Sequence, residues 1–132
     1  MNQRVLALFS VLACCGNAVP VTAAVTVIRH LAGYQCMALS LSQSEMMNPS
    51  FVVPVLSEPS GNAPRLGVAG AVVAARYPTL KKNGFVEVLF PTGRTAWIVA
   101  RFLKAWSPAL GTNGTCSPAL LSNGRLGFDY TR

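Results

Sequence analysis

The sequence predicts an all-β fold, a small barrel, and three observations lead to this class. First, a turn-forming tripeptide at residues 91–93 separates two short apolar runs, which is the pattern of a β-hairpin. Second, further short runs rich in valine and alanine are bounded by glycine, proline and asparagine. Third, the chain has 132 residues, enough for one domain with a single core.

The hairpin strands are expected at residues 85–90 and 95–99. Side chains alternate between the two faces of a strand. Glu87, the only charged residue of the first strand, shares its face with Phe85. We therefore expect the Phe85 face to be the more exposed one.

Two more strands are expected before the hairpin. Residues 51–56 form an apolar run that enters a turn-rich segment. Pro54 has no N–H for a ladder hydrogen bond, so this strand should lie at a sheet edge or beside a bulge. Residues 71–75 form the next strand, and residues 76–84 form a loop with three positive charges and a tyrosine.

A short helix is expected near the N-terminal side of these strands, at residues 43–47. Ser42 and Glu45 have the spacing of a capping box, in which each side chain accepts a hydrogen bond from the other residue's backbone N–H. Pro49 pushes the residue before it out of the helical region, so the helix should end there.

Residues 1–24 have the pattern of a secretory signal peptide. A positive charge at Arg4 precedes an apolar run at residues 5–15, and the small residues of segment 21–24 offer a cleavage site. The alternatives are a retained membrane anchor, or lipidation at Cys14. With cleavage, we expect the protein to be periplasmic or secreted.

Cys36 and Cys116 remain after cleavage, and in an exported chain they are expected to form one structural disulfide. The alternative, two buried thiols in a cytosolic protein, requires that residues 1–24 are not a signal peptide. Residues 107–132 contain the turn signal Asn123-Gly124 and are predicted to form a tail laid back over the barrel, held by this disulfide.

Several blocks of the chain resemble the bacterial SH3 domain family. They are residues 53–60 (Val-Pro-Val-Leu-Ser-Glu-Pro-Ser), Gly70, residues 83–88 (Asn-Gly-Phe-Val-Glu-Val), residues 93–98 (Gly-Arg-Thr-Ala-Trp-Ile) and Phe102-Leu103. The resemblance implies a strongly bent barrel of five strands at residues 51–106, with residues 25–50 as an N-terminal extension that includes the helix. It also implies an exported module that binds cell-wall peptides or cooperates with cell-wall enzymes. Residues 99–102 lack the Pro-x-Asn-Tyr element of the eukaryotic relatives, which argues against polyproline binding.

No residue pattern indicates an enzyme. A cysteine or serine nucleophile needs a base, and the only histidine, His30, is expected to be exposed near the new N-terminus. Two carboxylates for glycoside hydrolysis would have to come from four acidic residues that form no active-site motif: Glu45, Glu58, Glu87 and Asp129. With one histidine and two oxidised cysteines we expect no metal site, and we expect no cofactor.

Aromatic and basic residues suggest a ligand-binding groove instead. Aromatic faces with a cationic rim suit acidic peptides or sugars. The candidate residues are Tyr77, Lys81, Lys82, Phe85, Trp97, Arg101 and Phe102. Trp97 would alternatively fill the mouth of the barrel, and the two lysines would alternatively be a solvated loop.

A formal net charge of +7 favours acidic partners. We expect a cell-wall peptide or an envelope protein as the partner. A permanent structural subunit of a larger envelope assembly is the alternative. Nucleic acid is not expected, because an exported protein rarely meets it and the chain has no nucleic-acid motif. Contact with a membrane is expected only if the N-terminal segment is retained or Cys14 is lipidated.

Overall fold

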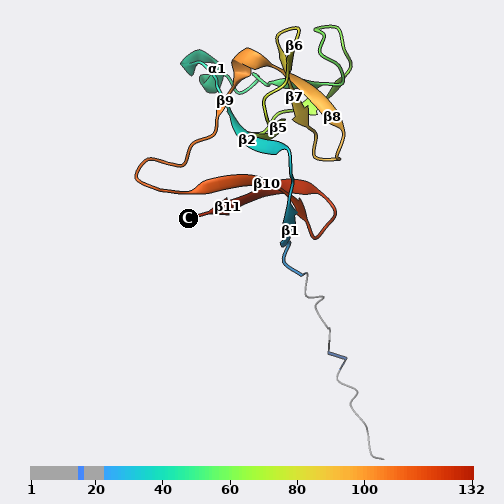
Figure 1. Cartoon of the computed structure of the whole chain (residues 1–132), viewed down its shortest axis with the longest axis vertical. Coiled ribbons are helices and arrows are strands. Elements are labelled where there is room, and N and C mark those ends of the chain that lie inside the picture. The colour runs from blue at the N-terminus through green and yellow to red at the C-terminus, as the bar shows by residue number, and fades with distance from the viewer. Residues whose placement is uncertain (1–14, 17–22) are drawn as a thin grey trace, which may run out of the picture.

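The computed structural model describes residues 15–16 and 23–132. The expectations of a signal peptide and of lipidation at Cys14 fall almost entirely outside these residues. The described chain is mostly β, and its strands form two antiparallel sheets that lie one above the other (Figure 1). No helix among the described residues has the length and apolar character needed to cross a membrane.

The larger sheet contains eight strands of the described region in the order β4-β3-β8-β7-β5-β2-β9, with β6 paired to β7 beside this path. The predicted hairpin is confirmed, since β7 and β8 pair from Phe85↔Val99 to Leu89↔Thr95 and Gly93 turns with a φ of 91°. The bounds of the strands are β2 (Tyr34–Leu39), β3 (Pro54–Leu56), β4 (Arg65–Val68), β5 (Val72–Arg76), β6 (Lys81–Lys82), β7 (Phe85–Leu89), β8 (Thr95–Val99) and β9 (Leu103–Ala105).

The larger sheet differs from the expected closed barrel, because it stays open between its end strands, β4 and β9. The pairing between the neighbouring strands β3 and β8 is also short, since it consists of a single residue pair, Leu56↔Trp97. The register of β3 against β4 shifts between Val55 and Leu56, one residue after Pro54, and β3 lies between β4 and β8, so of the two expected placements the edge is wrong and the irregular register fits a bulge. Strand β2 joins this sheet although the sequence indicated no strand there, so the sheet extends beyond residues 51–106.

The smaller sheet has the order β1-β10-β11, with β1 at Val27–His30, β10 at Thr115–Leu121 and β11 at Leu126–Thr131. The expectation of a tail at residues 107–132 is therefore corrected, because most of this segment is a β-hairpin. Its turn lies at the predicted Asn123-Gly124, where Gly124 has a φ of 79° that favours glycine. The Gly124 N–H donates to the Leu121 carbonyl, which closes the turn.

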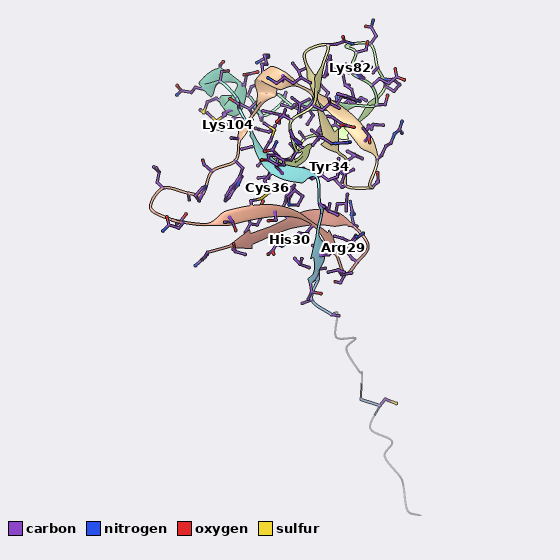
Figure 2. The ribbon with its side chains drawn as sticks, in the orientation of Figure 1. Arg29, His30, Tyr34, Cys36, Lys82 and Lys104 are labelled. Carbon is purple, nitrogen blue, oxygen red and sulfur yellow. A yellow bond between two sulfur atoms is a disulfide. The ribbon has the colours of Figure 1, made fainter. Side chains whose placement is uncertain are left out.

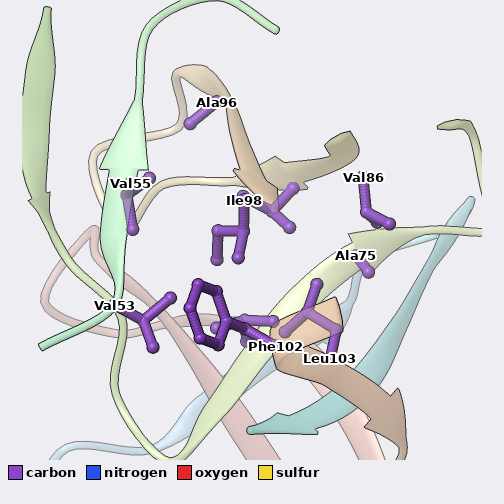
Figure 3. Packing of buried hydrophobic residues seen from close by; sticks show 10 residues of the cluster. Val53, Val55, Ala75, Val86, Ala96, Ile98, Phe102 and Leu103 are labelled. Carbon is purple, nitrogen blue, oxygen red and sulfur yellow. The ribbon is translucent and has the colours of Figure 1, made fainter. Parts of the chain in front are cut away.

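The core lies against the inner face of the larger sheet (Figure 3). Ile98 and Val86 are its largest fully buried side chains, and Val53 and Val55 from β3 and the segment before it complete one wall. The prediction that the Phe85 face of β7 is exposed is wrong, because Phe85 and Glu87 are each only 8% exposed. A sheet that is covered on both sides buries both faces of its central strand.

A disulfide joins the two sheets, since Cys36 lies on β2 and Cys116 on β10 (Figure 2). The expected disulfide is therefore present, with a Cα–Cα distance of 6.0 Å. Helix α1 spans Gln43–Met47. The Ser42 N–H donates to the Glu45 carboxylate and the Glu45 N–H donates to Ser42 Oγ, so the capping box is formed.

Candidate functional site

Two of the predicted ligand-binding residues belong to the core. Phe85 is 8% exposed and Phe102 is 7% exposed. The Phe102 ring lies 5.8 Å from the Phe51 ring, centroid to centroid, in a tilted arrangement typical of aromatic packing. These two side chains stabilise the fold and offer little surface to a ligand.

Arg101 contacts two other side chains of the protein, Phe102 and Glu45. Its guanidinium lies 3.8 Å from the centroid of the Phe102 ring and 3.4 Å from the Glu45 carboxylate. The pKa of Glu45 is held below its ordinary value, first by the hydrogen bond from the Ser42 N–H and then by the Ser42 hydroxyl and the Arg101 charge. Arg101 thus attaches helix α1 to the short 3-10 helix at Ala100–Phe102, which lies between β8 and β9.

Trp97 is partly buried on β8, where it lies opposite Glu87 on one side and Leu56 on the other. Glu87 accepts a hydrogen bond from Arg76 Nη1 at 3.4 Å, so its buried carboxylate has a charged partner. Trp97 therefore lies on the sheet face opposite the core cluster, beside an ion pair.

Tyr77, Lys81 and Lys82 are exposed residues of the segment between β5 and β7, and Lys82 is labelled near the top of Figure 2. Tyr77 is 63% exposed, and the two lysines lie on β6, paired with Val86 and Phe85. Neither lysine meets a carboxylate among the described residues. Of the seven predicted residues, Tyr77, Lys81, Lys82 and Arg101 are exposed, and the first three belong to this one segment.

A separate apolar pocket lies between the two sheets, and the sequence did not reveal it. Its cavity volume is about 80 Å³, which is the scale of one or two aliphatic side chains and well above the 10–15 Å³ that holds one water molecule. The larger sheet lines it from several segments and β11 lines it from the other sheet. The lining residues are Val55, Val68, Ala69, Gly70, Val72, Val73, Ala74, Val88, Leu89, Phe90, Pro91, Ile98, Leu126, Gly127 and Phe128.

One backbone hydrogen bond joins the two sheets at the border of this pocket. The Leu126 N–H donates to the Pro91 carbonyl at 3.3 Å, so the start of β11 is attached to the β7–β8 turn. Arg125 precedes Leu126 and Arg94 closes the β7–β8 turn. Neither arginine has a carboxylate partner among the described residues, so the chain segments on both sides of this hydrogen bond carry free positive charge.

Two further observations concern the titratable and metal-ligating side chains of the described residues. His30 Nε2 lies 2.7 Å from Asp129 Oδ2, and the His30 side chain is exposed, as the sequence predicts. The described residues contain no group of three or more His, Cys, Asp and Glu side chains placed to hold a metal ion.

Comparisons with protein-family models, with curated proteins and with solved structures gave no match to this chain.

The pocket was missed because its lining comes from both sheets, and β11 was not predicted as a strand. The signal for β11 is nevertheless in the sequence. After Asn123-Gly124, Leu126, Phe128 and Tyr130 alternate with smaller or polar residues, which is the period of a strand with one apolar face.

Proposed function

We propose that this protein is an exported, non-catalytic binding module whose larger sheet is a partly open, SH3-like barrel. Its ligand is a cell-wall peptide or a peptide segment of an envelope protein. A disulfide fits a location outside the cytoplasm, where thiols are oxidised.

The apolar pocket between the sheets carries this proposal. It is lined by hydrophobic side chains, and free arginines lie on the segments that border it. A small apolar cavity with a few charged groups near it suits one aliphatic side chain of a peptide that carries carboxylates. Its volume is small for a whole drug-sized ligand, whose pockets span about 300–1,000 Å³.

The exposed loop with Tyr77, Lys81 and Lys82 is proposed as a second contact. Its side chains have no charged partners among the described residues, and an acidic ligand would supply them. Phe85, Phe102 and Arg101 are not needed in this proposal, because the fold already uses them. Trp97 remains a candidate contact on the face opposite the core.

The direct test is retention of the purified mature protein on isolated cell wall at low salt, with crosslinking in the intact envelope to find a protein partner. Val68 lines the pocket and is 48% exposed, so Val68→Lys should block the pocket without disturbing the core. Val52 is 43% exposed and does not line it, so Val52→Lys is the matched control for charge.

We expect Val68→Lys to lose most of the retention or crosslinking and Val52→Lys to keep it. A wild-type protein that stays in the supernatant and crosslinks to nothing would overturn the proposal. Equal behaviour of the two variants would remove the pocket from it.

A second function, a permanent subunit of a larger envelope assembly, is favoured by exposed apolar side chains away from the pocket. Val25, Val27 and Ile28 are 55%, 40% and 60% exposed, and Met46 and Met47 of α1 are also exposed. Exposed apolar side chains that gather in one patch mark interaction sites, and Val25, Val27 and Ile28 follow one another at and before the start of β1. A monomer that purifies from crosslinked cells without a partner would count against this function.

A further inference from the structure

We propose that the free edge of β11 receives an extended acidic peptide, which adds to the smaller sheet as a fourth strand and places an aliphatic side chain in the pocket. This inference rests on the proposed binding function and names how the ligand is held. Four observations lead to it.

The hydrogen-bond pattern of the hairpin shows which backbone groups are free. The Leu121 N–H donates to the Arg125 carbonyl, so these two residues form a hydrogen-bonded pair. In an antiparallel ladder such pairs alternate with pairs whose backbone groups point outward. The register then directs the N–H and C=O groups of Leu126, Phe128 and Tyr130 away from β10.

The first of these outward groups already has a backbone partner. The Leu126 N–H donates to the Pro91 carbonyl of the β7–β8 turn. Within the described chain, Phe128 and Tyr130 have no backbone partner across the same edge. The edge therefore has one backbone hydrogen bond at its start and continues with unpaired N–H and C=O groups, which can pair with another strand.

The side-chain direction places the pocket next to this edge. Cys116 pairs with Tyr130 and is bonded to Cys36 of β2, so the face that carries Tyr130 and Phe128 is turned toward the larger sheet. Phe128 and Leu126 line the pocket. A strand beside β11 would point alternate side chains to that same face, into the space between the sheets.

The charges around β11 favour an acidic occupant. Arg125 precedes the strand and Arg132 follows it, and neither meets a carboxylate among the described residues. The one acidic residue of β11, Asp129, is paired with His30. The other free edge of this sheet, β1, contributes no residue to the pocket.

The test uses the mature chain with three blocked peptides of sequence Glu-Xaa-Val-Xaa-Glu, in which Xaa is valine, leucine or isoleucine. Peptides with lysine at both ends are the charge control. Binding is followed by calorimetry and by amide hydrogen exchange. We expect at least one acidic peptide to bind and to protect the amides of Phe128 and Tyr130.

The decisive comparison is Tyr130→Pro against Tyr130→Ala. Both variants lose the ring of Tyr130, a residue that is 55% exposed, but only the proline variant loses the outward N–H. Proline is tolerated on an edge strand when that N–H points away from its neighbour. We expect Tyr130→Pro to bind about fivefold more weakly than Tyr130→Ala, the effect of one lost hydrogen bond.

Equal binding by these two variants would overturn the inference, as would failure of every acidic peptide. A concentration-dependent dimer that Tyr130→Pro abolishes would assign the edge to a second copy of the chain and also overturn it. If Tyr130→Pro fails to fold, the wild-type exchange data decide: protection of Phe128 and Tyr130 by the peptide supports strand addition, and its absence refutes it. Should Tyr130→Pro be retained on cell wall like wild type, the binding function stands and strand addition alone fails.

Discussion

The imidazole of His30 and the carboxylate of Asp129 join the two outer strands of the smaller sheet, with Nε2 and Oδ2 2.7 Å apart. His30 belongs to β1 and Asp129 to β11, and β10 lies between them. The pair lies on the face of the sheet that also carries Ala119, which is fully buried. It is the one side-chain contact between charged groups that spans this sheet among the described residues.

Replacing His30 with alanine should lower the free energy of unfolding by about 1 kcal/mol or less, because exposed ion pairs contribute little. The His30 side chain is 56% exposed and that of Asp129 is 30% exposed. Urea unfolding measures the difference. A loss of several kcal/mol would mean that the pair holds β1 in place far more strongly than its exposure indicates.

Replacing both Cys36 and Cys116 with alanine should lower the free energy of unfolding by about 4 kcal/mol, because the disulfide closes a long loop in the unfolded chain. The two cysteines are 80 residues apart in sequence. Urea unfolding with and without reductant checks this. The wild type should respond to reductant and the double variant should not, and equal sensitivity of the two would contradict the assignment.

Ile98→Ala should lower the free energy of unfolding by about 2–5 kcal/mol, since it leaves a cavity in the core. Ile98 is 0% exposed and lies on the inner strand β8, between β3 and β7. Thr95→Ala on the same strand is the matched control, because Thr95 is exposed and its loss should change stability by about 0.5 kcal/mol or less. Thermal or chemical unfolding of the two variants should separate them clearly.

Glu45→Gln should lower the free energy of unfolding at neutral pH. The free energy of unfolding of the variant should also fall less steeply than that of the wild type as the pH decreases below 4.5. The folded pKa of Glu45 lies below its ordinary value of 4.5, so its carboxylate stabilises the fold at pH values above 4.5. This contribution is lost as the pH falls through the lower folded pKa. The difference between wild type and variant, measured by unfolding from pH 7 to pH 3, should therefore be constant above 4.5 and shrink below it.

Local signals in the sequence were sufficient for the parts of the fold that depend on nearby residues. The hairpin of β7 and β8 follows from a glycine turn, and the helix at Gln43–Met47 follows from the spacing of Ser42 and Glu45. The disulfide followed from the number of cysteines left in an exported chain.

Features that depend on distant pairing were not predicted. Strand β2 looks like a plain apolar run, and only its pairing with β5 and β9 makes it an inner strand of the larger sheet. Phe85 was misplaced because one glutamate suggested an exposed face, whereas Arg76 provides the charge that lets Glu87 be buried. The pocket forms only because β11 contacts the β7–β8 turn, and no local sequence pattern predicts this long-range contact.

The disulfide also sets how the molecule would respond to proteolysis. Strands β3 to β9 all lie between Cys36 and Cys116 in the sequence, so they belong to one covalent ring, and β1 and the hairpin partner β11 lie on the two arms outside it. A single cut in the loop that joins β9 to β10 would open the ring but leave both fragments bonded to each other. Separation of the β10–β11 hairpin from the larger sheet by that cut would also require reduction of the disulfide, whereas a cut between β1 and β2, or in the β10–β11 turn, would sever the covalent link to an outer strand without any reductant.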